Sequence, residues 1–399
     1  MSSSLLLRLL ALALLVTGCS EPVPSADAGR DVDAEVSDPP DAASPDAGRD
    51  DAGPIQADAS VPPCPDGEGP TITAVLGDTD HGGAMEIRGC GLGEEASPTP
   101  LIWDDFEGGT LGELAGDGWR LQRERETHPI YTDVQFYGQG RLSLTNHVEP
   151  NVNDAPGCQF CGAYQEVEPS NELYVSYRFR FDVTGDDYGV LKLARLASSP
   201  NYGGVDHYNG VGTLMFQYQA HAGWGYANLV TGVGEHPSIT IGGVPRGEWH
   251  RVEMYYRLSS PAGAANGAAY IAIDGEHERR FDIDDAITLD SDYPTQLHSL
   301  LLPLMLANPR DDGVFDLYVD DVYLDDSRAR VEVADAPRWL DTRRREIQPA
   351  TAWAPDRIDV TVHQGAFEAC EPVYPYVLDA SGAPLSEAGF PLALGSGCP

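Results

Sequence analysis

Leu-Tyr-Val-Ser-Tyr-Arg-Phe-Arg-Phe, residues 173–181, alternates between two kinds of side chain along its whole length. A period of two is typical of a β-strand that packs one face on a hydrophobic core. We therefore expect the core face to carry Leu173, Val175, Tyr177, Phe179 and Phe181. The opposite face, which we expect to meet solvent or ligand, would carry Tyr174, Ser176, Arg178 and Arg180.

Similar short runs recur on both sides of this stretch, at residues 190–196, 214–219, 250–258, 268–274 and 315–324. Turns rich in Gly, Asn and Asp separate them, such as Asn266-Gly267 and Asp274-Gly275. No convincing helical pattern lies between them. This spacing predicts an all-β fold, with two sheets packed as a β-sandwich.

Three motifs carry a resemblance to the concanavalin-like jelly rolls of lectins, glucanases and polysaccharide lyases. They are Trp103-Asp104-Asp105-Phe106-Glu107, then Gly247-Glu248-Trp249-His250-Arg251-Val252-Glu253, then Tyr318-Val319-Asp320-Asp321-Val322-Tyr323-Leu324. The resemblance covers residues 101–335 and implies a jelly-roll β-sandwich there. This fold hosts binders and enzymes alike, so activity has to be argued from the site.

A narrower resemblance, to jelly-roll alginate and glucuronan lyases, lies in four segments. They are residues 177–181, 189–193 (Gly-Val-Leu-Lys-Leu), 214–217 (Leu-Met-Phe-Gln) and 224–226 (Trp-Gly-Tyr). In those lyases one strand supplies a catalytic lysine and a later strand supplies an active-site tyrosine. The resemblance implies that Lys192 and Tyr226 take these two positions.

Composition bears on Lys192 independently, because it is the single lysine among the 25 Lys and Arg residues of the chain. Arginine cannot act as a base, whereas a desolvated lysine can lose its proton near neutral pH. An amine at this position therefore fits a catalytic role. The alternative is a solvated strand residue that survived by chance.

As a lyase, the protein would eliminate across a uronic acid, which needs a group that neutralises the carboxylate, a base and an acid. Arg178, Arg180 or Gln217 could neutralise the carboxylate. Lys192 and Tyr226 would divide the roles of base and acid. His207, in the glycine-rich loop at residues 201–212, is an alternative base or a surface residue.

Two other functions stay open. Trp224 and Tyr226 could stack on sugar rings, which would serve a non-catalytic carbohydrate-binding protein as well as an enzyme, or they could be core residues. A purely structural envelope protein is the third candidate. Glycoside hydrolysis ranks lower, because it needs two neighbouring carboxylates, whereas Glu248 and Glu253 fall on opposite strand faces.

The strongly negative net charge limits the possible binding partners, and three of the acidic residues suggest a cation site. The formal net charge of -38 argues against nucleic acid and against unassisted binding to anionic lipid. In jelly rolls a carboxylate near the first strand and one in the last strand often share a structural Ca²⁺. Glu107 with Asp320 or Asp321 would supply these ligands, although acidic turn residues also occur without a metal.

The start of the chain predicts export and lipid anchoring. An apolar run from Leu5 to Val16 contains Arg8 and ends in Val16-Thr17-Gly18-Cys19. It is shorter than the roughly 20 residues that span a bilayer, so residues 1–19 are typical of a lipoprotein signal peptide that leaves Cys19 acylated. Ser20 then favours the outer membrane. Residues 20–66, rich in Asp, Ala, Ser, Gly and Pro, predict a disordered acidic tether.

Six further cysteines in an exported chain suggest disulfides, which we expect as Cys64–Cys90, Cys158–Cys161 and Cys370–Cys398. Cys158 and Cys161 could instead be redox-active or half of a zinc site. Residues 67–100 resemble part of an immunoglobulin-like IPT module, and residues 336–399 predict a small β module clasped by Cys370–Cys398. We expect both to be spacing or docking elements.

Overall fold

The computed structural model describes residues 69–116, 118–121, 129–148, 162–184, 190–197, 213–219, 224–230, 238–275, 280–289, 296–302, 305–307 and 314–398. The predicted signal peptide with Cys19, the tether, His207 and the Cys158–Cys161 pair lie outside these residues. Among the described residues, none forms a helix that is long and apolar enough to cross a membrane.

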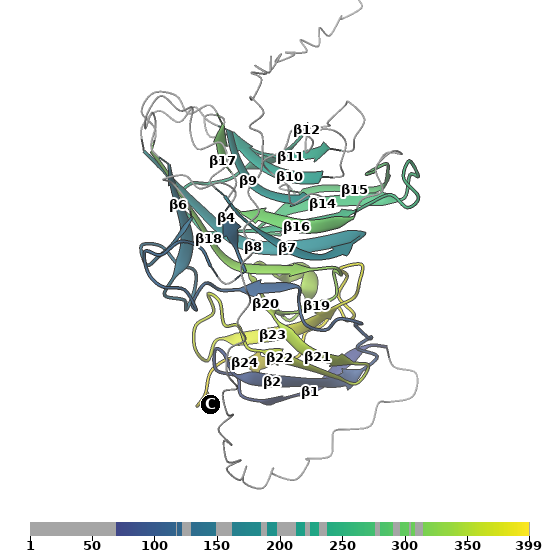
Figure 1. Ribbon diagram of the computed structural model, residues 1–399. Coiled ribbons are helices and arrows are strands. Elements are labelled where there is room, and N and C mark those ends of the chain that lie inside the picture. The colour runs from purple at the N-terminus through teal and green to yellow at the C-terminus, as the bar shows by residue number, and fades with distance from the viewer. Residues whose placement is uncertain are drawn as a thin grey trace, which may run out of the picture. The chain divides into compact units, whose positions relative to one another are not determined.

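Two large antiparallel sheets form the predicted β-sandwich (Figure 1). The first, which we call the β8 sheet, has the order β15 (Arg280–Ala286), β14 (Gly267–Ile273), β13 (His250–Arg257), β8 (Glu172–Thr184), β18 (Val314–Asp325), β6 (Ser143–Val148) and β5 (Ile130–Thr132), with β3 (Ile102–Asp104) also paired to β18. The second, the β9 sheet, has the order β12 (Ser238–Gly243), β11 (Trp224–Val230), β10 (Thr213–Gln219), β9 (Val190–Ala197), β16 (Leu297–Leu302), β7 (Ala163–Ser170) and β4 (Arg120–Leu121), with β17 (Met305–Ala307) also paired to β9.

The hydrophobic core lies between these two sheets, as the alternation in residues 173–181 predicts. All five residues expected on the core face of β8 are buried in it, where they join Leu214 and Phe216 of β10. Most of the other face of β8 does not meet solvent, because Tyr174, Ser176 and Arg178 are buried as well, whereas Arg180 is partly exposed. A second domain covers that face.

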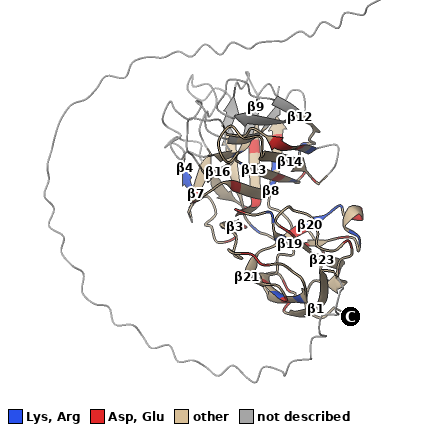
Figure 2. Cartoon of the chain, turned by 90° about the vertical axis from the view of Figure 1, so that its right-hand side faces the viewer, with Lys and Arg blue, Asp and Glu red and all other residues tan. Residues whose placement is uncertain are grey.

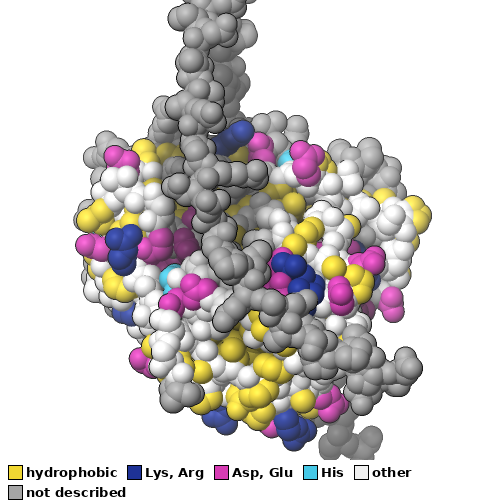
Figure 3. Space-filling model, turned by 90° about the horizontal axis from the view of Figure 1, so that it is seen from below, with side chains coloured by type: hydrophobic (Ala, Val, Ile, Leu, Met, Phe, Trp, Pro, Cys, Tyr) yellow, Lys and Arg dark blue, Asp and Glu magenta, His cyan; other side chains and the backbone are white. Residues whose placement is uncertain are grey.

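This second domain, which we call the small sandwich, is assembled from both ends of the described chain. One sheet has the order β1 (Thr71–Gly77), β2 (Ala84–Cys90), β22 (Arg357–Thr361) and β21 (Ala350–Ala354). The other has the order β20 (Arg345–Gln348), β19 (Arg330–Ala334), β23 (Pro372–Leu378) and β24 (Leu392–Ala393), and a 3₁₀ turn, η4 (Trp339–Asp341), follows β19. Figure 3 views this domain, whose described surface mixes hydrophobic, acidic and basic side chains.

The two flanking segments of the sequence therefore share one core. Ile87 on β2 pairs with Ile358 on β22, and both pack with Val331 of β19 and Val373 of β23. The Cys370–Cys398 disulfide is confirmed. Cys90 is also disulfide-bonded, and its predicted partner Cys64 lies outside the described residues.

An arginine–glutamate network joins the small sandwich to the β8 sheet; it consists of Arg251, Glu253, Arg330, Glu332 and Arg345. Nη2 of Arg251 on β13 lies 2.7 Å from Oε1 of Glu332 on β19. In the opposite direction, Glu253 on β13 pairs with Arg330 at 3.2 Å and with Arg345 at 3.3 Å. Figure 2 shows the charged segments of both domains near this junction.

The network is buried, so its charges depend on one another. The side chains of Glu253 and Glu332 are 3% and 0% exposed. Burial alone would raise the pKa of Glu253, but Arg251, Arg345 and Arg330 lower it to about 2. The carboxylate therefore stays ionised in the folded protein far below neutral pH.

Replacing Glu332 with Gln leaves Arg251 and Arg330 buried with one counter-charge fewer. We expect Glu332→Gln to lower the free energy of unfolding by about 3–5 kcal/mol, the usual cost of breaking a buried ion pair. Urea denaturation at pH 7 measures this change. Glu166→Gln is the matched control, because Glu166 pairs with the largely exposed Arg120 and should cost about 0–1 kcal/mol. Equal effects of the two variants would contradict the argument.

Asp325, at the end of β18, is a buried carboxyl whose pKa is raised rather than lowered. Burial raises the pKa of Asp325 to about 7, whereas the unfolded value is about 4. Between these pH values the folded state holds a proton that the unfolded state has released, so stability falls as pH rises through this window. Asp325→Asn stays uncharged, and we expect its melting temperature to exceed that of the parent protein at pH 8 and not at pH 4. Thermal scans measure both proteins at both pH values. The same difference in melting temperature between variant and parent at pH 4 and at pH 8 would contradict a raised pKa of Asp325.

Candidate functional site

Three strands of the β9 sheet bring Lys192, Gln217 and Tyr226 into one row. Gln217 on β10 pairs in register with Lys192 on β9 and with Tyr226 on β11. Neighbouring strands lie about 4.8 Å apart, so the backbone positions of Lys192 and Tyr226 are about 10 Å apart, with Gln217 between them. Three residues singled out from separate stretches of sequence are therefore neighbours in the sheet.

This row belongs to the face of the β9 sheet that is turned away from the hydrophobic core. Leu214 and Phe216 of β10 are buried in that core. Because successive residues of a strand alternate between faces, position 217 falls on the other face, and its partners in register share it. We call the side of the sheet that contains this row the outer face.

A β-bulge in β9 adds Arg195, which is buried, to the outer face. Phe216 pairs with Ala194 and Gln217 pairs with Lys192, which leaves Leu193 as an extra residue. Residues three apart in a regular strand lie on opposite faces, but the extra residue returns Lys192 and Arg195 to the same one. Sequence analysis missed Arg195, because strict alternation excludes it and only the observed register includes it.

Trp224 also belongs to the outer face. It lies two positions before Tyr226 on β11 and pairs with Gln219, which lies two positions after Gln217 on β10. A second row thus runs beside the first. The structure brings together four of the predicted site residues, Lys192, Gln217, Tyr226 and Trp224.

The structure does not bring Arg178 and Arg180 to this face, since both lie on β8 in the opposite sheet. Arg178 forms an ion pair with Glu346 and donates to the Arg345 carbonyl oxygen at 2.9 Å, so it is committed to the small sandwich. Arg180 pairs with Asp182 at 3.1 Å. The alternation in residues 173–181 correctly predicts that both lie on the face of β8 that is turned away from the jelly-roll core. It does not predict whether a ligand or a second domain contacts that face.

The residues expected to bind Ca²⁺ have other close partners. Glu107 accepts the Leu142 N–H at 2.8 Å and pairs with Arg141. Asp320 accepts the N–H groups of Tyr137 and Asp321 at 2.8 and 2.9 Å. Among the described residues, the group of potential ligands that contains Asp321 includes Glu346 and His363, and neither Glu107 nor Asp320.

No protein-family model matches the chain, and no curated protein matches it. Solved structures to which it is similar include alginate lyase Aly36B in complex with an alginate tetrasaccharide, at 14% identity and a TM-score of 0.42, over 57% of this chain and 97% of that one. Alginate lyase vAL-1 from Chlorella virus shares 11% identity, with a TM-score of 0.37, over 52% and 91% of the two chains. The PL-14 alginate lyase from Aplysia kurodai shares 11% identity, with a TM-score of 0.36, over 49% and 86%. These values are too low to carry an inference about activity.

Proposed function

We propose that this protein is a surface lipoprotein whose jelly roll cleaves a uronate-containing polysaccharide by β-elimination. The observation that carries the proposal is the register that aligns Lys192, Gln217 and Tyr226 across three adjacent strands. This row combines an amine, an amide and a phenol, which are the group types that the reaction needs. Anchoring through Cys19 in the outer membrane is part of the proposal and rests on the sequence alone.

The reaction removes the proton on C5 of the uronate, forms the C4–C5 double bond and breaks the bond from C4 to O4. Gln217 would donate from its amide to the substrate carboxylate, and Arg195 would add positive charge nearby, so that the C5 proton becomes acidic. Lys192 and Tyr226 flank Gln217 and would divide the roles of base and acid. One takes the C5 proton, and the other donates a proton to the departing O4.

The separation of the two flanking positions suits this division. Backbone positions about 10 Å apart leave room for a sugar ring between an acid and a base. If one residue served as both acid and base, two such groups on either side of Gln217 would not be needed. Trp224 in the next row would offer a stacking surface for a neighbouring sugar.

Replacing the amine or the phenol should abolish turnover. We expect Lys192→Ala and Tyr226→Phe each to lower kcat about 10²–10⁴-fold, the usual contribution of one general acid or base. If Lys192 is the base, Lys192→Arg should lower kcat as well, because guanidinium does not lose its proton. The assay follows the ultraviolet absorbance of the unsaturated uronate product with alginate, glucuronan and other polyuronates.

Thr351→Ala, at an exposed position of β21 in the small sandwich, is the control and should retain full activity. Retained glycan binding without turnover of any polyuronate by the parent protein would refute the lyase and leave a carbohydrate-binding protein. Loss of both would point to the structural role. Equal turnover by Lys192→Ala would remove Lys192 from the mechanism.

The net charge of -38 predicts an unusual salt dependence for a polyanionic substrate. The Debye length falls from about 30 Å at 0.01 M salt to about 8 Å at 0.15 M, which screens long-range repulsion between protein and polymer. We expect kcat/KM to rise over this range. A fall would mean that local positive charge at the site outweighs the net charge of the protein in the field that the approaching polymer meets.

A further inference from the structure

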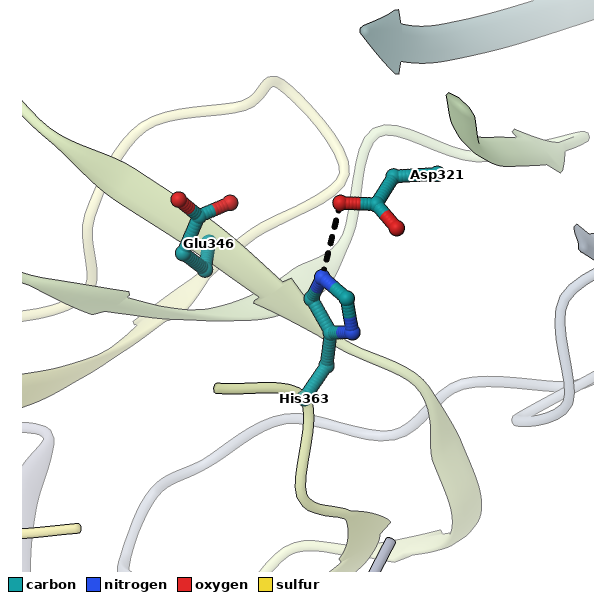
Figure 4. A group of neighbouring side chains, drawn as sticks. All are labelled: Asp321, Glu346 and His363. Atoms are coloured by element: carbon teal, nitrogen blue, oxygen red, sulfur yellow. Dashed lines mark hydrogen bonds and ion pairs between the residues drawn. The ribbon is translucent and has the colours of Figure 1, made fainter. Parts of the chain in front are cut away.

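A second group of side chains with the chemistry of a site lies at the junction of the two domains, away from the β9 sheet. Asp321 comes from β18, Glu346 from β20 and His363 from the segment just after β22 (Figure 4). Nε2 of His363 lies 2.8 Å from Oδ2 of Asp321. One ligand atom from each of the three residues lies within 4.8 Å of the other two.

The group is enclosed. The side chains of Asp321, Glu346 and His363 are 10%, 2% and 8% exposed. They line a cavity of about 10 Å³, which is room for one water-sized sphere. The ring of Trp103 lies edge-on to the imidazole, with the centroids 4.9 Å apart, and forms another part of the wall.

Surrounding groups hold the three side chains in place. Tyr137 donates its O–H to Oε1 of Glu346 at 2.6 Å, and Arg178 donates to Oε2. Oε1 also accepts the Ala366 N–H at 3.4 Å. Oε2 has a second lone pair, so Glu346 keeps acceptor capacity at that oxygen. Hydrogen bonds of this kind to ligating carboxylates are typical of metal sites.

The backbone also favours the arrangement. Asp321 has a positive φ of 48° at the irregularity in β18 where its pairing with β8 shifts. Gly365, with φ of 54°, passes so close to Glu346 that a Cβ there would lie 2.4 Å from the carboxylate carbon. A side chain at position 365 would therefore displace Glu346.

The charges leave a deficit of cations beside Asp321. Arg251, Arg345 and Arg178 also line the cavity, but each pairs with a glutamate, namely Glu332, Glu253 and Glu346 respectively. Asp320 and Asp321 are adjacent carboxylates, and their one ion-pair partner among the described residues is His363. Nε2 of His363 is the imidazole nitrogen that faces Asp321, whereas Nδ1 lies on the other side of the ring and is buried with no hydrogen-bond partner in the described part of the chain (Figure 4).

We propose that Asp321, Glu346 and His363 bind one divalent transition-metal ion, Zn²⁺ in preference to Ca²⁺, which ties the jelly roll to the small sandwich. Two carboxylate oxygens and an imidazole nitrogen are ligands that Zn²⁺ accepts at about 2.0–2.2 Å. Ca²⁺ prefers six to eight oxygen ligands, whereas this group offers two carboxylates and one imidazole nitrogen. The ion replaces the hydrogen bond between His363 and Asp321 and releases the proton that it holds.

The test uses the full chain without a histidine tag, treated with a chelator and then titrated with ZnCl₂ in a calorimeter. The expected result is one Zn²⁺ per chain, with a melting temperature that rises with Zn²⁺ concentration because the ion binds the folded state. Addition of CaCl₂ at the same concentrations should leave the melting temperature unchanged. Co²⁺ in place of Zn²⁺ should give visible absorption bands that report nitrogen and oxygen ligands.

Asp321→Asn and His363→Gln should each reduce Zn²⁺ affinity at least 10-fold, and circular dichroism should verify that both variants are folded. His147→Ala is the matched control, because His147 also pairs with an aspartate, Asp316, but on the exposed surface. It should bind Zn²⁺ as the parent protein does. No stoichiometric uptake by the folded parent chain, or a Zn²⁺ affinity in both site variants equal to that of the parent, would overturn the proposal. Because none of these readouts measures turnover, they are independent of the proposed lyase activity.

Discussion

The buried arginine–glutamate network on the outward face of β8 is the constraint around which the two domains are arranged. Four of its side chains have almost no contact with water, so each guanidinium needs its carboxylate and each carboxylate needs its guanidinium. The network also explains why an amphipathic strand can have two buried faces. Its apolar face packs in the jelly-roll core, and its polar face packs on the small sandwich.

Local sequence patterns predicted the large sandwich well, because residues 173–181 and the neighbouring runs carry a period of two that burial of one face imposes. The same patterns could not predict the role of Arg178. An arginine on a strand face has the same sequence signature whether it meets solvent, ligand or another domain. Only the contact with Glu346, which lies 168 residues further along the chain, decides this.

The outer face contains residues that could be predicted individually, but their arrangement could not be predicted from the sequence. Lys192, Tyr226, Gln217 and Trp224 could be chosen for their chemistry and resemblance, but their alignment depends on pairing between strands. Arg195 needed the bulge at Leu193 as well, which strict alternation does not foresee. The Asp321, Glu346 and His363 group could not be predicted for a related reason, since three separate segments, β18, β20 and the residues after β22, supply one residue each.

The composition of the small sandwich from both ends of the chain has a consequence for the folding of a chain that emerges from its N-terminus. Residues of β1 and β2 emerge first, but β22, which pairs with β2, emerges only after the whole jelly roll. The apolar face of β2, with Met85 and Ile87, therefore stays without its partner strand until the whole jelly roll has emerged.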